Sequence, residues 1–248
     1  MYFKKISFLN FVILAPCILL SGAENPECCK PTVVIDFHGV MTKFNLRGAA
    51  NAIRAAFRDA PTIRQKIDLF FTLLKPSTFR SGAYVQSESL RRIYNDCHDL
   101  NPEMVQLVQE LKKSGYPVIL FTNMDSKSLD EWRENNQHVF ENFSAIHSVT
   151  VDTDNTYHAE LRKKYPQAYI SCAALINQEF AGKPVVLIDD KPKVLEMAQK
   201  FMLPQLNCGC CAVAAASCLT TVRFTGSGKI RAALAQAGIQ PADSQKTT

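Results

Sequence analysis

Residues Thr32-Val33-Val34-Ile35-Asp36-Phe37-His38-Gly39 decide how this chain folds. They join a β-branched, apolar run to one carboxylate, and a turn signal follows directly. A continuous apolar run of this kind is typical of a strand that is buried on both faces, as in a parallel sheet. We therefore predict a strand over 32–37 that carries Asp36 near its carboxyl end.

Further apolar runs repeat this pattern along the chain. The runs at 118–121, 145–151, 184–188 and 220–224 are predicted strands, and stretches with helical spacing separate them. Strands that alternate with helices indicate an α/β fold, here a Rossmann-like three-layer sandwich with a mainly parallel sheet. Active sites of such sheets lie at the carboxyl ends of the strands. Thr122, Asn123, Asp189 and Asp190 follow predicted strands, and we expect them to meet Asp36 there.

A helical insertion follows the first strand. Residues 45–75 show helical spacing that is interrupted at Pro61, residues 87–100 predict another helix, and Asn101 and Pro102 open the next as its N-cap and first residue. Arg47, Arg54 and Arg58 share one helical face, which either meets an anionic substrate or is simply solvated. The predicted core is 32–42 and 101–240, and the insertion is 43–100.

Composition places the chain among ordinary globular proteins. Of 248 residues, 47% are hydrophobic and 21% are charged, and the formal net charge is +5. This small charge gives no reason to expect a nucleic-acid partner, which usually requires a clustered basic face.

The first 23 residues predict a signal peptide. Lys4 and Lys5 precede the mostly apolar stretch 6–20, and Ser21-Gly22-Ala23 resembles a cleavage site. The apolar stretch is short for a membrane span, which needs ~20 residues. We expect export to the periplasm or outside the cell, with an uncleaved membrane anchor as the alternative. Residues 241–248 are a predicted disordered tail.

The cysteines fit export, because eight of the nine follow the predicted signal peptide. An even number in an exported chain predicts disulfides, although the sequence does not give their connectivity. Cys208, Cys210, Cys211 and Cys218 could instead bind a soft metal, but they lack the paired spacing of a structural zinc site.

The residues at the strand ends suit phosphoryl transfer. A carboxylate can attack phosphorus, and two more carboxylates can hold Mg²⁺. A threonine hydroxyl and a lysine can bind the oxygens on which charge is spread in the transition state. The substrate predicted on these grounds is a small phosphorylated molecule.

The same residues, in this order, resemble the motifs of the haloacid dehalogenase-like superfamily. Residues 33–41, VVIDFHGVM, resemble its first motif, residues 118–123, VILFTN, its second, and residues 185–190, VVLIDD, its fourth. The stretch from Lys163 to Tyr169 resembles the third motif, with Lys164 as the alternative lysine.

The resemblance implies a role for each residue. Asp36 would be the nucleophile, and Thr122, Asn123 and Lys163 would bind the phosphoryl group. Asp36, Asp189, Asp190 and the backbone carbonyl of His38 would hold Mg²⁺. The insertion would be a small cap of the kind called C1, which closes over the site.

The chain departs from the family pattern at His38. Family phosphatases usually carry an aspartate here as the acid and base. Three alternatives stay open: His38 does acid–base work, as imidazole can; the chain is a hydrolase for another reaction; or catalysis is impaired and the fold serves binding.

Overall fold

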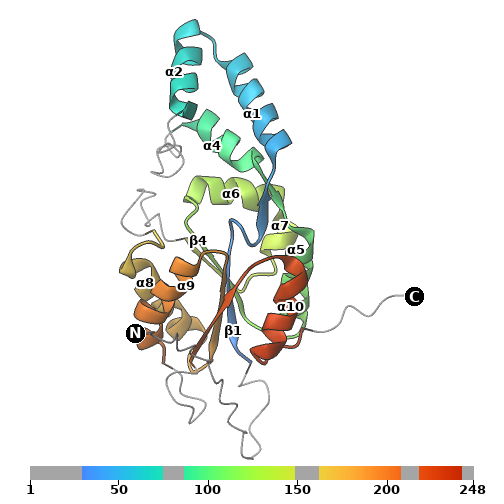
Figure 1. Ribbon diagram of the computed structural model, residues 1–248, viewed down its shortest axis with the longest axis vertical. Helices are drawn as coiled ribbons and strands as arrows, with labels where there is room; N and C mark the ends of the chain where they lie inside the picture. The colour runs from blue at the N-terminus through green and yellow to red at the C-terminus, as the bar shows by residue number, and fades with distance from the viewer. Residues whose placement is uncertain (1–29, 75–86, 149–161, 208–217, 242–248) are drawn as a thin grey trace, which may run out of the picture.

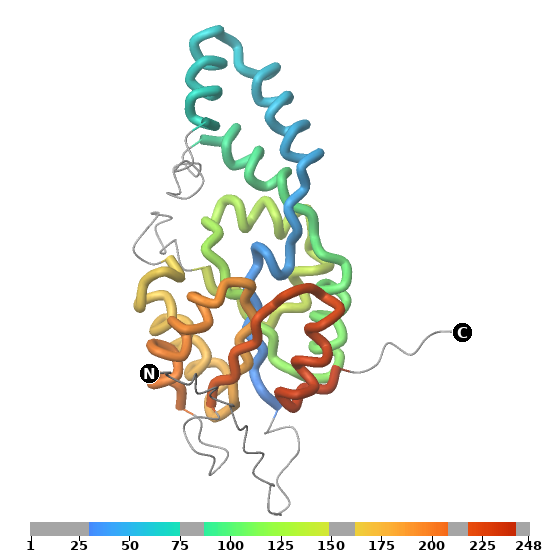
Figure 2. Tube along the Cα trace, in the orientation of Figure 1, coloured from blue at the N-terminus to red at the C-terminus, as the bar shows by residue number. Residues whose placement is uncertain are grey.

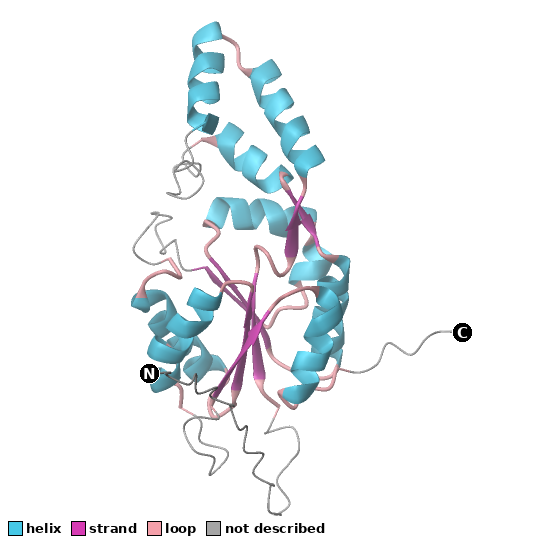
Figure 3. Cartoon of the chain, viewed as in Figure 1, coloured by secondary structure: helices cyan, strands magenta, loops and turns pink. Residues whose placement is uncertain are grey.

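The computed structural model describes residues 30–74, 87–148, 162–207 and 218–241. The described chain contains a five-stranded parallel sheet in the order β5-β4-β1-β6-β7 (Figure 3). The strands are β1 (Thr32–Asp36), β4 (Val118–Thr122), β5 (Ala145–Ser148), β6 (Val185–Asp189) and β7 (Leu219–Arg223). This architecture confirms the predicted fold class.

Helices cover both faces of the sheet (Figure 1). Helices α5 (Pro102–Lys113) and α10 (Ser227–Gln236) pack on one face, and α8 (Pro166–Glu179) and α9 (Pro192–Phe201) on the other. Every residue of β1, β4 and β6 is buried, because these strands have helices on both sides. That explains why their sequences are continuous apolar runs without alternation.

The register brings the polar strand ends together. Ile35 of β1 pairs with Leu120 of β4 on one side and with Ile188 of β6 on the other. Because the three strands are parallel, their carboxyl ends lie at the same edge, and Asp36, Thr122 and Asp189 are the last residues of the three.

The insertion leaves and rejoins the core through a second, two-stranded antiparallel sheet of β2 (Thr42–Phe44) and β3 (His98–Leu100). Its described helices are α1 (Leu46–Asp59), α2 (Ile63–Leu74) and α4 (Glu88–Asp96), which lie apart from the parallel sheet (Figures 1 and 2). They share a small core of Ala52, Leu90 and Ile93.

One expectation needs correction here. The predicted helix 87–100 ends at Asp96, because residues 98–100 pair with β2. Asn101 is the N-cap residue of α5 and Pro102 its first residue, as predicted. The Asn101 side chain makes no cap hydrogen bond, and its amide nitrogen donates instead to the carbonyl of Val40 at 3.4 Å.

Two short helices complete the described core. Helix α6 (Ser126–Asn135) and α7 (Gln137–Phe140) follow β4, and a 3-10 turn, Leu203–Gln205, follows α9. None of the helices in the described ranges is long and apolar enough to span a bilayer. The predicted signal peptide and residues 242–248 of the tail lie outside the described residues.

The described cysteines do not bear out pairing of all eight. Cys97 and Cys172 are buried free thiols, and burial raises the pKa of Cys97 to about 11 and that of Cys172 to about 12. Cys172 packs in the core against the α8 face of the sheet. Cys28, Cys29, Cys208, Cys210 and Cys211 lie outside the described residues, so a disulfide among them stays a prediction.

Candidate active site

Three carboxylates meet at the carboxyl edge of the sheet. Asp36 ends β1, Asp189 ends β6, and Asp190 follows Asp189. One carboxylate oxygen of each lies within 4.8 Å of those of the other two. Ionised carboxylates this close repel one another, so the arrangement requires a positive charge among them.

Lys163 supplies such a charge. Its Nζ atom donates to Asp36 Oδ1 at 2.5 Å and to Asp189 Oδ2 at 3.2 Å, and the side chain is buried. Burial alone would lower the pKa of Lys163, but the two carboxylates outweigh it and raise the pKa above that of an ordinary lysine. The ammonium group therefore stays charged at neutral pH.

The chain around Lys163 fixes its direction. Its backbone N–H donates to Asn123 Oδ1 at 2.8 Å, and its carbonyl accepts from the Tyr169 hydroxyl at 2.5 Å. The ammonium also lies 4.3 Å from the centre of the Phe121 ring. Lys164 is exposed and lies over Tyr165. Of the two candidate lysines, the structure thus brings Lys163 to Asp36.

Thr122 lies at the end of β4, fully buried. Its Oγ1 atom accepts from the Met124 N–H at 3.0 Å. This bond orients the hydroxyl and leaves its proton without an acceptor among the described residues. Thr122 can therefore donate to an oxygen of a bound group, whereas Asn123 uses its Oδ1 atom to hold Lys163.

The oxygen atoms that remain suit a hard cation. In the described chain, Asp36 Oδ2 accepts no hydrogen bond, and Asp190 Oδ1 is buried without a hydrogen-bond partner, 3.7 Å from Lys191 Nζ. Burial raises the pKa of both Asp189 and Asp190. Mg²⁺ prefers carboxylate oxygen ligands, so this donor set fits the ion. The His38 carbonyl as a further ligand stays a prediction.

Gly39 allows Asp190 to come this close to the first motif. Its φ is +91°, and a Cβ atom built on it would lie 2.7 Å from Asp190 Oδ2. A side chain here would collide with a carboxylate and strain the backbone. The positive φ therefore favours glycine at this position, and the absence of a side chain leaves room for the Asp190 carboxylate.

The His38 ring packs against the insertion. Its centre lies 4.7 Å from that of His98 and 5.1 Å from that of Tyr94, and Nδ1 lies 3.4 Å from the Tyr94 hydroxyl. Nε2 is buried without a hydrogen-bond partner. Burial lowers the pKa of His38 well below its ordinary value, and nearby positive groups act in the same direction. His38 is therefore neutral at pH 7.

Tyr94 and His98 were not among the predicted site residues. Neither has a motif or a ligand spacing in the sequence, and β3, which carries His98, was predicted as helix. Their place beside His38 follows from the pairing of β2 with β3, which is a contact between distant parts of the chain.

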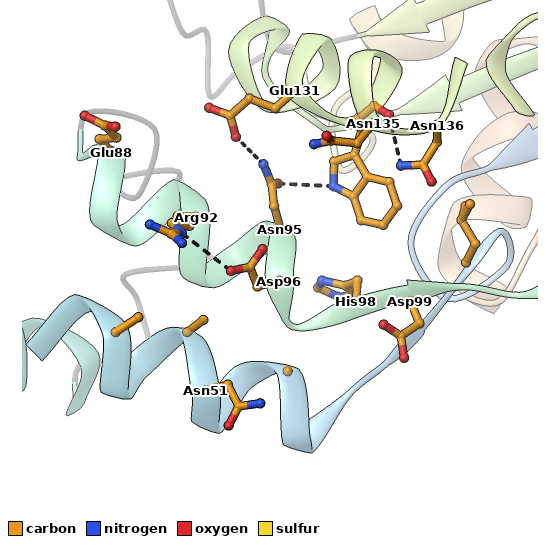
Figure 4. A pocket seen from close by; sticks show the side chains of 15 residues that line it. Asn51, Glu88, Arg92, Asn95, Asp96, His98, Asp99, Glu131, Asn135 and Asn136 are labelled. Atoms are coloured by element: carbon orange, nitrogen blue, oxygen red, sulfur yellow. Dashed lines mark hydrogen bonds and ion pairs between the residues drawn. The ribbon is translucent and has the colours of Figure 1, made fainter. Parts of the chain in front are cut away.

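A cavity of 850 Å³ lies where the insertion meets the core (Figure 4). Asn95 of α4 joins the two parts there: it donates to Glu131 Oε2 at 2.6 Å and accepts from the Trp132 indole at 3.2 Å. The three site carboxylates do not line this cavity. The hydrogen bonds of Asn95 hold α4 against α6, and we assign no catalytic role to the residues that line this cavity.

Comparison with known proteins identifies the family. The family model described as haloacid dehalogenase-like hydrolase matches residues 30–201, which include all the site residues above. The chain belongs to the haloacid dehalogenase-like hydrolases. This family accounts for the order of the strand-end residues, and it shows that the chain is a hydrolase-family protein.

One solved structure is similar enough to show a shared fold, and a second is similar at a lower score. A putative beta-phosphoglucomutase from Thermotoga maritima is 15% identical, with a TM-score of 0.51, covering 83% of this chain and 99% of that one. A haloacid dehalogenase-like hydrolase from Streptococcus pneumoniae is 14% identical, with a TM-score of 0.46, covering 83% and 98%. A search of curated proteins found no match.

Proposed function

We propose that this chain is a Mg²⁺-dependent phosphohydrolase that acts on a small phosphomonoester through an aspartyl-phosphate intermediate on Asp36. The observation that carries the proposal is the buried Lys163 ammonium between Asp36 and Asp189, beside a third carboxylate at the same strand edge. This arrangement orients one carboxylate as a nucleophile and supplies positive charge where phosphoryl oxygens would lie.

Each residue has a task in the proposed reaction. Lys163 holds Asp36 Oδ1, so Oδ2 is the oxygen that attacks phosphorus. The bond from phosphorus to the ester oxygen breaks as the new bond forms, and the leaving alcohol takes up a proton from solvent water. Thr122 and Lys163 hold the phosphoryl oxygens during transfer. Water then attacks the aspartyl-phosphate and returns Asp36 as a carboxylate with inorganic phosphate.

Asp36, Asp189 and Asp190 would hold the metal. Mg²⁺ bound there would offset the repulsion between these carboxylates and the incoming phosphate dianion. Of the three, Asp189 is also tied to the chain, because its Oδ1 atom accepts from the Lys191 N–H at 2.9 Å. That bond orients the carboxylate before any ligand arrives.

His38 would take the place of the acid–base aspartate of family phosphatases. Because its ring is neutral at pH 7, it would act as the base that takes a proton from the attacking water. Tyr94 holds its Nδ1 side, which leaves Nε2 for proton transfer. Positioned acid–base catalysis is typically worth about 10²–10⁴-fold. Because the ring is packed between residues of the insertion, its position depends on how the insertion sits on the core.

Export completes the proposal. We infer from residues 1–23 that a signal peptide is removed and that the chain acts outside the cytoplasm, where the cysteines beyond the described ranges would be oxidised. N-terminal sequencing of the protein from its own cells would check this; a chain that begins at Met1 would contradict cleavage.

Phosphate release from an aryl phosphate tests the proposed reaction. We expect turnover that requires Mg²⁺ and falls at least about 10³-fold in Asp36→Asn, because the amide is not a nucleophile. Asp130→Asn is the matched control, since Asp130 is an exposed carboxylate on α6, and it should leave turnover unchanged.

A His38→Asp variant separates the remaining alternatives. Turnover in the natural protein that Asp36→Asn abolishes supports the phosphohydrolase. No turnover in the natural protein, with a gain in His38→Asp, would contradict it and indicate a hydrolase fold kept for binding.

A further inference from the structure

Helix α2 exposes an unusual number of large apolar side chains. No residue of α2 is buried. The exposed fractions are 78% for Ile63, 49% for Ile67, 49% for Phe70, 58% for Phe71 and 60% for Leu74. Single exposed apolar residues are common on proteins, but five on one twelve-residue helix are not.

These five side chains form one continuous face of the helix. At 3.6 residues per turn they fall within a sector of roughly 100°. Leu69 and Leu73 lie on another side of the helix and pack against the small core of the insertion. The exposed apolar face is therefore not the face by which α2 is held in the fold.

Basic residues border this apolar face. Arg64 follows its first residue and Lys66 precedes its second, and both are exposed, one on each flank of the sector. The two helices α1 and α2 together carry five basic residues and two acidic ones. All five are exposed, namely Arg47, Arg54, Arg58, Arg64 and Lys66.

Among the residues that the structure describes, the position of α2 leaves the face accessible. Helices α1 and α2 extend away from the parallel sheet and form the end of the molecule farthest from it (Figures 1 and 2). A flat surface can approach this end without touching the core helices.

We propose that the apolar face of α2, with its basic flanks, binds the surface of an anionic lipid bilayer. An amphipathic helix with phenylalanine, leucine and isoleucine on one side and lysine or arginine beside them lies in the bilayer interface, where anionic headgroups attract the basic side chains. The proposal does not depend on the phosphatase chemistry, because none of these residues belongs to the candidate active site.

A second copy of the chain fits this face less well. A stable protein interface buries about 800 Å² on each partner, which one face of a short helix does not offer. Two copies would also bring two basic hairpins together, whereas anionic lipid complements their charge. A bilayer needs no matching shape.

Fluorescence from α2 itself tests the proposal. The chain has one tryptophan, Trp132, which is buried in the core, so Phe71→Trp adds a reporter on the apolar face. The variant is mixed with vesicles of phosphatidylcholine alone or with phosphatidylglycerol, with and without brominated acyl chains. Both the full chain and the chain from Glu24 are used, because the apolar stretch 6–20 binds lipid on its own account.

We expect the added emission to shift to shorter wavelength and to be quenched by brominated lipid in the anionic vesicles. Phe70→Ser with Ile67→Ser should lower vesicle partitioning by at least about tenfold. These side chains are exposed, so folding is not at issue. Leu46→Ser, which removes a still more exposed apolar side chain outside this face, should leave partitioning unchanged.

A second pair of variants tests the basic residues beside the apolar face. Arg64→Gln with Lys66→Gln should reduce the preference for anionic vesicles, because Arg47, Arg54 and Arg58 remain, whereas Lys200→Gln with Lys229→Gln, on core helices, should keep it unchanged. Emission that is the same with and without vesicles would overturn the proposal. A shift that needs no lipid, grows with protein concentration and accompanies a doubled mass would overturn it in favour of a second copy.

Discussion

Lys163 and Lys164 are adjacent in the sequence but lie in different environments. Lys163 is buried against two carboxylates, and Lys164 is exposed. An exposed charge contributes little to stability. Removing one member of a buried ion cluster destabilises the fold, because the remaining charges are left unpaired in the protein interior. The two lysines therefore offer a comparison in which chain position is nearly constant, while burial and the contact with carboxylates change.

We predict that Lys163→Met lowers the free energy of unfolding by about 3 kcal/mol or more in the presence of a chelator. Lys164→Met should change it by less than about 0.5 kcal/mol. Urea unfolding of both variants checks this. Equal losses would mean that the Asp36–Lys163 contact does not stabilise the fold.

At this scale the sequence predicted the residues that lie at strand ends. Asp36, Thr122 and Asp189 each follow a recognisable buried run, and parallel strands bring such ends together. Tyr94 could not be predicted as a site residue, because no local sequence pattern shows which face of an insertion packs against the core. The packing of His38 against it appears only once β2 and β3 are paired.

Among the helices, α6 depends on a buried cap. Asp125 directly precedes this helix. Its Oδ1 atom accepts from the Ser128 N–H at 3.0 Å, and its Oδ2 atom accepts from the Ser128 hydroxyl at 2.6 Å. These bonds satisfy donors that the first turn of a helix leaves open. The same helix carries Glu131 and Trp132, which hold Asn95 of the insertion.

Replacing this cap should weaken both the helix and its contacts. We expect Asp125→Ala to lower the free energy of unfolding by about 1–2 kcal/mol, because a buried N-cap is lost. Asp130→Ala, in the same helix but exposed, is the control and should have little effect. Denaturant titration of the two variants measures the difference; similar midpoints would contradict the capping role.

The elements that the sequence predicted well are those whose pattern is local. The strands of the parallel sheet are short apolar runs bounded by turn signals, and Pro61 separates α1 from α2 as expected. Residues 98–100 were wrongly taken as helix, because their extended form comes from pairing with residues 42–44, which lie far away in the sequence. Such long-range pairing overrides local preference.

A partly buried histidine, His147, is expected to make the fold sensitive to acid. Burial lowers the pKa of His147 to about 4, and the charge of Lys163 acts in the same direction. The unfolded chain binds a proton near pH 6.5, so it takes up protons that the folded chain excludes. The contribution of His147 to stability is therefore complete above about pH 6.5 and is lost as the pH falls toward 4.

We predict that the free energy of unfolding falls by up to about 2 kcal/mol between pH 7 and pH 5 through His147. His147→Gln should reduce this fall, and His138→Gln, at an exposed position, should not. Urea titrations at both pH values compare the three proteins. A fall of the same size in His147→Gln would contradict the prediction.

The paired strands β2 and β3 also bear on how such a chain changes over evolutionary time. Phe44 lies opposite His98, so the chain departs and returns at points only about 5 Å apart. A segment with ends this close is lengthened, shortened or replaced without moving the strands that it interrupts. Selection can therefore vary the outer helices, and with them the molecules or surfaces that the protein contacts, while Asp36, Asp189, Asp190 and Lys163 keep their positions.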